Sequence, residues 1–350
     1  MKKLLTLLLA VMMALAAGCG GKDSATGDGK GRTDFKIGYL ASTGHILYFI
    51  AQEKGFFSEE GLNTELVLFN NSGEGLTALA GRKLDVGPFG SSAPLLYMSK
   101  GSQLTIFGGQ MSQGHALVAK PEKVKEYSDI KNLKGKTIAT IRLATGDIVF
   151  RNAVLQAGLK INQDVIFKEM ESAAAALEAV KKGMADAAVV WTPFRKTAEL
   201  QGLAVVKYSS QVAGFENHPC CRQIAATAAL KEHPERYVAF HRALIKAYRF
   251  YKTNREESID ILAKYVDIDK KILFEETYGG YVESNPDPAR SEVIGFYQFM
   301  KEAGYIEKDF DVREHINVDI YKKALESLLK ETPEDKILIG LRQEFSRNDR

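Results

Sequence analysis

Residues 39–61 have the sequence YLASTGHILYFIAQEKGFFSEEG, and this stretch decides the fold. Phe35–Leu40 is apolar and β-prone, Thr43-Gly44 interrupts it, and His45–Glu53 carries apolar residues at helical spacing. Asn63–Phe69 then ends in an apolar run, as expected for a strand buried on both faces. A strand, a tight turn, a helix and a second strand predict a parallel sheet within an α/β protein.

The turn Ser42–His45 follows the first predicted strand directly. In parallel sheets, ligands bind beyond the carboxyl ends of the strands, where helix N-termini expose unpaired N–H groups. Thr43, Gly44 and His45 are therefore candidate ligand contacts. The alternatives are that Thr43 only caps the following helix and that His45 caps or packs.

The chain has 350 residues with 45% hydrophobic content, enough for one large domain or two medium domains with cores of their own. The formal net charge is +3 at pH 7, and two of the lysines lie in the first three residues. This balance does not indicate nucleic acid as a partner.

The N-terminus has the pattern of an export signal. A basic start, Met1-Lys2-Lys3, precedes the short apolar segment Leu4–Ala17, which is too short for a membrane span. The sequence LAAGC ending at Cys19 resembles the lipobox of bacterial lipoproteins. We therefore expect a signal peptide at 1–18, acylation of Cys19, a flexible tether at 19–33, and a protein anchored by lipid on the extracytoplasmic face of a membrane in a bacterial cell envelope.

After the first unit the α/β pattern continues and then restarts near Gly135, and an apolar strand near Gln223 returns before a mostly helical remainder. Two α/β lobes joined by two crossings are therefore expected. The predicted boundaries are 34–117 for the first part of lobe 1, 118–212 for lobe 2, 213–335 for the return to lobe 1 with the C-terminal helices, and 336–350 for a tail.

Candidate contacts also follow a later strand of the first lobe. Phe89, Gly90, Ser91 and Ser92 combine hydroxyl groups with N–H groups that suit a sulfonate, a carboxylate or a ring carbonyl. The alternative for these residues is turn formation and helix capping. Gln110 is a further candidate on the same lobe.

The second lobe offers a cation and a carboxylate at one turn. Arg142, Thr145, Gly146 and Asp147 precede or begin a predicted helix, so they can contact a ligand, although Asp147 can equally be a cap. If both charged residues reach the ligand, it carries an acceptor and a donor.

The pair Trp191-Thr192 ends a predicted strand at the same edge. There the tryptophan can stack on a flat ligand or fill the core of the lobe.

Several motifs together resemble the extracytoplasmic substrate-binding proteins of ABC importers for nitrate, taurine, alkanesulfonates and thiamine-pyrimidine precursors. They are GHILYFIAQEKGFFSEEGL at 44–62, ALAG at 78–81, LDV at 84–86, Gly90, NLKGKTIA at 132–139 and ADAAVVWTPF at 185–194. The resemblance implies a type II periplasmic-binding-protein fold that closes over a small organic ligand, sulfonate-like, taurine-like or pyrimidine-like. It also implies a monomer without a cofactor that delivers its ligand to an ABC permease and its ATPase.

An enzyme of the same fold in thiamine-pyrimidine biosynthesis is the alternative. The segment His218-Pro-Cys-Cys-Arg222 lacks the separated ligand pairs of a structural zinc site, so no metal is expected, and one cysteine should face each side of the strand. The related fungal pyrimidine synthases carry a longer cysteine cluster at a comparable place, and this chain lacks the extra cysteines, which favours a binding protein over an enzyme. The export signal favours a binding protein as well.

Overall fold

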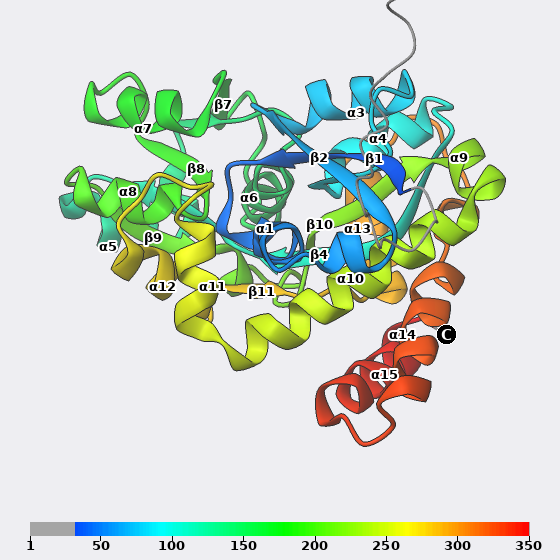
Figure 1. Ribbon diagram of the computed structural model, residues 1–350. Helices are drawn as coiled ribbons and strands as arrows, with labels where there is room; N and C mark the ends of the chain where they lie inside the picture. The colour runs from blue at the N-terminus through cyan, green and yellow to red at the C-terminus, as the bar shows by residue number, and fades with distance from the viewer. Residues whose placement is uncertain (1–31, 350) are drawn as a thin grey trace, which may run out of the picture. The chain divides into compact units, whose positions relative to one another are not determined.

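In the computed structural model, which describes residues 32–349, β1 (Thr33–Leu40) and β2 (Leu62–Phe69) pair in parallel. α1 (Ile46–Glu53) and α2 (Phe56–Glu59) lie between them in the chain, so the predicted strand–helix–strand unit is confirmed (Figure 1). The expectation that β2 is buried on both faces is wrong, because β2 is an edge strand of a two-stranded sheet and Leu68 is 56% exposed. An apolar run alone does not reveal how many neighbours a strand has.

The main sheet of the first lobe has the strand order β11-β4-β10-β3. A bridge between Ile37 and Val86 connects β1 to the segment that enters this sheet. The Gly- and Gln-containing second half of β4 pairs with β10 and β11. The strands are β3 (Gly87–Gly90), β4 (Leu104–Gln113), β10 (Pro219–Ala226) and β11 (Val282–Ser284).

The sheet of the second lobe has the order β7-β6-β8-β5-β9. The expected boundary at residue 117 falls inside β5, because β5 pairs with β8 and β9, and the chain therefore enters this lobe at His115. The strands are β5 (His115–Ala119), β6 (Lys136–Thr140), β7 (Val165–Glu169), β8 (Ala187–Trp191) and β9 (Ala204–Tyr208).

Helices cover both sheets, and the chain returns to the first lobe through β10 as predicted. The remaining α-helices are α3 (Ser72–Ala80), α4 (Ser92–Ser99), α5 (Val124–Tyr127), α6 (Thr145–Gln156), α7 (Ala173–Lys181), α8 (Phe194–Leu200), α9 (Thr227–Glu232), α10 (Pro234–Thr253), α11 (Arg255–Leu262), α12 (Lys270–Tyr278), α13 (Arg290–Glu302), α14 (Asp319–Glu331) and α15 (Lys336–Asn348). Short 3₁₀ helices are η1 (Thr43–His45), η2 (Pro121–Lys123), η3 (Ile130–Leu133), η4 (Ser209–Gln211) and η5 (Val312–His315).

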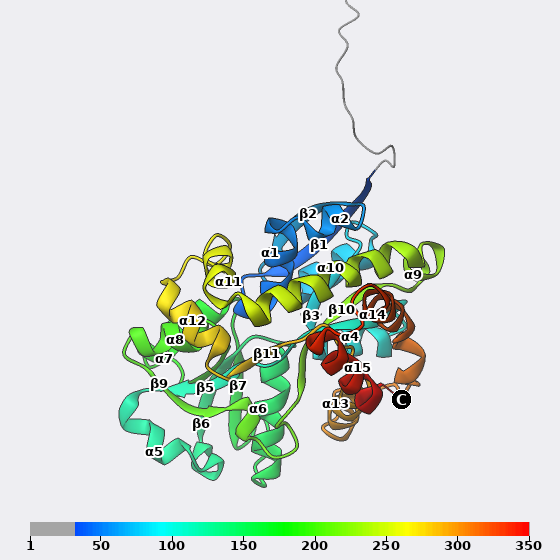
Figure 2. The same cartoon turned by 60° about the horizontal axis from the view of Figure 1, so that its bottom comes forward.

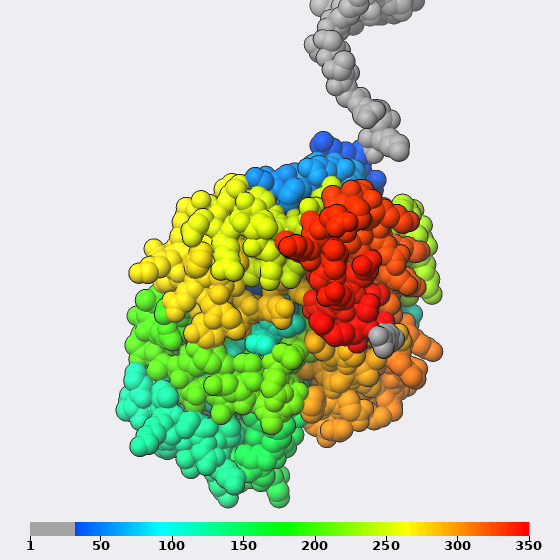
Figure 3. All heavy atoms as spheres, turned by 90° about the horizontal axis from the view of Figure 1, so that it is seen from below, coloured from blue at the N-terminus to red at the C-terminus, as the bar shows by residue number. Residues whose placement is uncertain are grey.

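α15 replaces the tail expected at 336–350. Its first N–H groups are capped by the Asp335 carboxylate, and Leu338 and Leu341 are buried. Figure 3 shows α14 and α15 (red) beside α13 (orange), so this segment packs on the first lobe.

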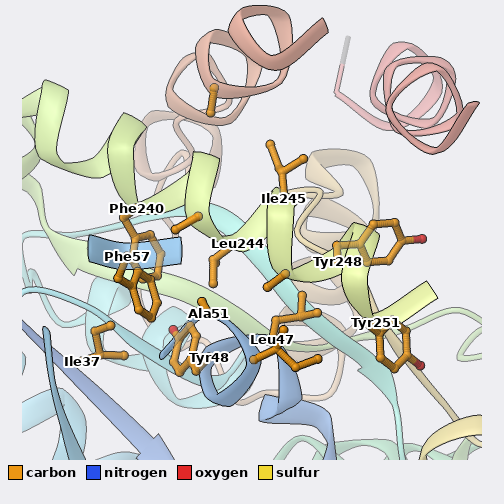
Figure 4. Packing of buried hydrophobic residues seen from close by; sticks show 14 of the residues in the cluster. Ile37, Leu47, Tyr48, Ala51, Phe57, Phe240, Leu244, Ile245, Tyr248 and Tyr251 are labelled. Atoms are coloured by element: carbon orange, nitrogen blue, oxygen red, sulfur yellow. The ribbon is translucent and has the colours of Figure 1, made fainter. Parts of the chain in front are cut away.

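The core of the first lobe forms where α10 crosses α1. Figure 2 shows α10 alongside α1, and Figure 4 shows Phe240 of α10 directed at Phe57. The two rings stack at 5.8 Å, and Tyr48 of α1 lies edge-on to Phe240 at 5.9 Å. Burial of each such side chain contributes about 1.5–3 kcal/mol relative to its exposed state, so this packing fixes α1 and the turn before it.

Among the described residues, none of the helices is both long and apolar enough to span a membrane.

Candidate functional site

A pocket lies where the two lobes meet, at the ends of β1, β3 and β8. It leaves a cavity of about 50 Å³, and its walls are mostly apolar. The first lobe contributes Leu40, Ser42, His45, Asn71, Ser72, Gly90, Met111, Cys220 and Cys221, and the second contributes His115, Ile141, Arg142, Leu143, Ala144, Thr145 and Trp191.

The N-termini of α1, α3, α4 and α6 converge on this pocket. His45 and Asn71 are the N-caps of α1 and α3, Gly90 directly precedes the cap of α4, and Thr145 begins α6. The first N–H groups of an α-helix have no partner within the helix and carry its positive partial charge. Their convergence gives an otherwise apolar pocket a preference for a negatively charged group.

His45 is a neutral hydrogen-bond donor in the pocket wall. Its Nδ1 accepts a hydrogen bond from the Leu40 N–H at 3.1 Å, so the ring proton is on Nε2, which is buried without a well-formed hydrogen bond although the Pro88 backbone also interacts with the ring. Burial lowers the pKa of His45 to about 4, so the ring is uncharged at neutral pH. An unsatisfied buried donor is costly, and a ligand acceptor would relieve that cost.

The two adjacent cysteines both line the pocket. Their Sγ atoms are 3.5 Å apart, and Nε2 of His115 lies 3.9 Å from the Cys220 Sγ. The expectation of one cysteine on each side of the strand is therefore wrong. Register shifts between β10 and β4 at Pro219, Cys221 and Arg222 interrupt the alternation that a regular strand would impose.

Of the residues predicted as contacts, His45, Gly90, Arg142, Thr145 and Trp191 line the pocket. The Arg142 side chain is 68% exposed and lies 3.8 Å from Glu169, so it stands at the rim. A Cβ atom on Gly90 would come within 2.9 Å of the Thr145 hydroxyl, so a glycine at this position lets the lobes approach each other.

Other predicted contacts stand behind the wall and hold it. The hydroxyl groups of Thr43 and Thr192 form a hydrogen bond of 2.6 Å across the lobes, and Gln110 donates to the Gly44 carbonyl at 3.0 Å. Ser91 donates to the Cys220 carbonyl through its hydroxyl at 3.0 Å, and Ser92 donates to the Leu143 carbonyl at 2.5 Å.

Gly44 lies against Met111, where a Cβ atom would come within 2.0 Å of the sulfur.

Three further predictions differ from what the structure places at the pocket. Phe89 is fully buried in the core of the first lobe, and Gly146 packs behind the His115 ring. Asp147 neither caps α6 nor lines the pocket, because its Oδ1 accepts from Arg151 Nε at 2.7 Å and from the Thr140 hydroxyl at 3.0 Å. Burial raises the pKa of Asp147, opposed by the charge of Arg151.

A match to a family model, described as the NMT1-like family, covers residues 28–267. The chain belongs to the NMT1-like family. A relative from Bacillus subtilis (strain 168), named "Putative aliphatic sulfonates-binding protein", is 30% identical over 338 residues, which cover 93% of this chain and 98% of the relative.

Solved structures of other proteins have the same fold as this member of the NMT1-like family. The periplasmic aliphatic sulphonate binding protein SsuA of Escherichia coli has a TM-score of 0.69 at 21% identity, covering 81% of this chain and 91% of that one. The periplasmic nitrate-binding protein NrtA of Synechocystis PCC 6803 has a TM-score of 0.75 at 17% identity, covering 85% and 89%. The expected periplasmic-binding-protein fold is confirmed. The relative from Bacillus subtilis supports a binding protein rather than an enzyme.

Several pocket residues of this NMT1-like protein were missed from the sequence. They are Leu40, Ser42, Asn71, Ser72, Met111, His115, Ile141, Leu143, Ala144, Cys220 and Cys221. Asn71 and Ser72 follow β2 directly, so their place at a strand end was a usable signal. Met111, His115 and the cysteines reach the pocket only through long-range pairing of β4, β5 and β10. Within residues 32–349, no group of three or more His, Cys, Asp and Glu side chains is placed to hold a metal ion.

Proposed function

We propose that this protein is an extracytoplasmic, lipid-anchored substrate-binding protein of an ABC importer, and that it captures a small organic anion with an apolar body. The observation that carries the proposal is the convergence of the N-termini of α1, α3, α4 and α6 on an apolar pocket. The anionic group would face the positive ends of these helices and would accept from His45 Nε2, with Arg142 attracting it at the rim. The apolar body would lie against Leu40, Met111 and Trp191.

The charges around the pocket favour a sulfonate over a zwitterion. Among the described residues that line it, none carries a carboxylate, and Asp147 is occupied by Arg151. The amino group of a taurine-like ligand would therefore lose its hydration without gaining a charged partner. The names of the sulfonate-binding relatives accord with this choice.

Capture requires the two lobes to close on the ligand. The hydrogen bonds between Thr43 and Thr192 and between Ser92 and Leu143 cross from one lobe to the other beside the pocket. A ligand that bridges both walls stabilises this closed arrangement, which a permease can then recognise. No covalent step is needed, and small-angle scattering should detect a more compact particle at ligand saturation.

A calorimetric series tests the ligand class. Short-chain alkanesulfonates, the carboxylates of equal chain length, taurine, nitrate and a hydroxymethyl-aminopyrimidine would be titrated into the purified protein. We expect the alkanesulfonates to bind most tightly, with affinity rising as methylene groups are added. Tightest binding of the pyrimidine would overturn the anion proposal and favour stacking on Trp191, and tightest binding of nitrate would contradict the apolar body.

Two variants locate the binding site. His45→Phe removes the Nε2 donor and should weaken sulfonate binding by about 1.5–3 kcal/mol, the usual cost of losing a hydrogen bond to a charged group. Arg313→Gln is the matched control for the charge of Arg142→Gln, because Arg313 is exposed and pairs with Asp311 away from the pocket. Equal affinities of these two arginine variants would remove Arg142 from the site.

The lipid anchor lies outside the described residues and has its own test. Cys19→Ser should release the protein from membranes and abolish labelling by a lipid precursor, whereas Cys220→Ser should leave the labelling intact. Continued labelling of the Cys19→Ser variant would contradict the proposal that Cys19 carries the lipid anchor.

A further inference from the structure

The adjacent thiols of Cys220 and Cys221 are the part of the pocket that ligand capture does not use. Both side chains are more than nine-tenths buried, yet both line the cavity, and their Sγ atoms are 3.5 Å apart. A cavity of about 50 Å³ admits molecules the size of water, which needs roughly 10–15 Å³ measured in this way. A small oxidant can therefore reach both sulfur atoms at once.

From this geometry we propose that Cys220 and Cys221 form a redox-sensitive dithiol. Hydroperoxides oxidise it to a disulfide between the adjacent residues, and this oxidation loosens the ligand pocket. The predicted weakening of ligand binding rests on the proposed function, whereas the formation of the disulfide does not.

The surroundings make the two thiols unequal. Burial opposes ionisation of Cys220, but the hydrogen bond from Cys221 and the neighbouring His115 ring outweigh it and lower the pKa of Cys220. The same hydrogen bond, together with burial, raises the pKa of Cys221. Because the thiolate is the nucleophile, Cys220 should react first and Cys221 should act as the resolving thiol.

The reaction proceeds in two steps. The Cys220 thiolate attacks one oxygen of hydrogen peroxide, the O–O bond breaks, and a sulfenic acid and hydroxide form. The Cys221 sulfur then attacks the sulfenic sulfur, the S–O bond breaks, the thiol proton leaves with the oxygen as water, and a disulfide remains. Overall, two thiols lose two hydrogen atoms and one peroxide becomes two molecules of water.

Closing this ring would disturb the contact between the lobes. The Cys220 carbonyl accepts from the Ser91 N–H at 2.6 Å and from the Thr145 hydroxyl at 3.3 Å, so it joins α4 of one lobe to α6 of the other. Adjacent Cα atoms are about 3.8 Å apart, below the usual disulfide range of about 4.4–6.8 Å. The peptide between the cysteines must therefore rotate, which turns its carbonyl away from Ser91 and Thr145.

The strain also makes the bond easy to reverse. Strained disulfides have more oxidising potentials than relaxed structural ones, and mild reductants open them. The pocket would return to its binding form on reduction.

Intact-mass spectrometry of the full chain with Cys19→Ser tests the chemistry without any ligand, because only these two thiols then remain. Stoichiometric hydrogen peroxide should remove two hydrogen atoms, and dithiothreitol should restore the mass. The additional change Cys221→Ser should leave a sulfenic acid on Cys220 that dimedone traps, whereas Cys220→Ser should react at least tenfold more slowly. A parent protein that gains oxygen atoms instead, or equal rates for the two cysteine variants, would overturn the proposal.

The structural consequence is measured by melting and binding. The oxidised parent should melt at a lower temperature than the reduced parent and bind a short alkanesulfonate at least tenfold more weakly, with both changes reversed by dithiothreitol. The Cys220→Ser variant should show neither change on peroxide treatment. A disulfide that forms with unchanged melting would contradict the coupling to Ser91 and Thr145. Failure of the sulfonate to bind even the reduced protein would count against the proposed function alone, since the mass and melting results do not depend on it.

Discussion

The hydroxyl oxygens of Thr43 and Thr192 lie 2.6 Å apart and link the first turn of one lobe to the end of β8 in the other. Both side chains are fully buried, and the Thr192 hydroxyl is also a hydrogen-bond partner of the Glu276 carboxylate. The residues expected to touch the ligand from opposite walls instead touch each other. The hydrogen bond between these two hydroxyl groups therefore forms only when the lobes are closed.

Thr43→Val should weaken closure, because it removes the hydrogen bond between Thr43 and Thr192 across the lobes, at a cost of about 0.5–1.5 kcal/mol. The double variant with Thr192→Val should lose more than Thr43→Val, because it also removes the contact of Thr192 with Glu276, but less than the sum of the two single losses. Ligand titration of the two single variants and the double variant gives the coupling energy. Strictly additive losses would indicate that the two hydroxyls act independently.

A second contact across the lobes joins α8 to α12. Arg195 Nε lies 2.7 Å from Glu276 Oε2, both side chains are buried, and the guanidinium carbon lies 3.9 Å from the Tyr281 ring centroid. Glu276→Gln would leave a buried arginine without its counter-charge, which costs about 3–5 kcal/mol when a buried pair is broken. We expect a more open particle in small-angle scattering and weaker ligand binding.

The neighbouring pair Lys196–Glu275 provides the matched control for Glu276→Gln. It joins the same two helices at 3.3 Å but is partly exposed, so Glu275→Gln should change affinity by no more than about 1 kcal/mol. If both variants bind ligand as the parent protein does, the α8–α12 contact does not govern closure.

The buried pair Asp147–Arg151 should matter for stability rather than for ligand selection. Asp147→Asn should lower the free energy of unfolding by about 3–5 kcal/mol, because Arg151 would remain buried without a counter-charge. Glu169→Gln, which removes the partner of exposed Arg142, should cost at most about 1 kcal/mol. Denaturant unfolding measures both, and equal losses would contradict this ranking.

The sequence predicted the elements whose signals are local. α10 and α12 lie in the mostly helical remainder that was predicted after Gln223, because their apolar residues recur at helical spacing between clear end signals. Two errors had local signals that went unused. Arg151 follows Asp147 by four residues, the spacing of a helical ion pair, and Asp335 followed by Ile337, Leu338 and Leu341 is the pattern of a capped helix.

Other features of the site depend on pairing between distant strands. The sequence does not reveal that β10 is irregular where it meets β4, and this irregularity brings both cysteine sulfur atoms to the pocket. His115 likewise becomes a pocket residue only because β5 joins the second sheet. The first-turn residues were predicted to be at the cleft, but whether a side chain faces the ligand or the other lobe is decided by packing between the lobes.

A carboxyl pair where α15 meets the start of α13 should make stability depend on pH. Asp287 and Asp349 are buried, and Asp349 Oδ1 accepts from the Arg290 N–H at 2.8 Å. Burial, with the nearby Asp349 carboxyl adding to it, raises the pKa of Asp287 to about 8. Because an aspartate in the unfolded chain has a pKa of about 3.9, the folded state holds a proton that the unfolded state has lost.

The stabilisation from this proton is complete below about pH 4 and is lost as the pH rises from about 4 to about 8, because the folded state binds the extra proton across that range. Asp287→Asn keeps a neutral side chain at every pH, so the difference in melting temperature between this variant and the parent should shift in favour of the variant as the pH rises through that window. Asp349→Asn is the matched control. It removes the neighbouring charge, which should lower the pKa of Asp287, so its melting temperature should depend less on pH than that of the parent. Melting curves from pH 4 to 9 measure all three proteins. A parent and an Asp287→Asn variant whose melting temperatures run parallel across this range would show that Asp287 is already ionised in the folded protein.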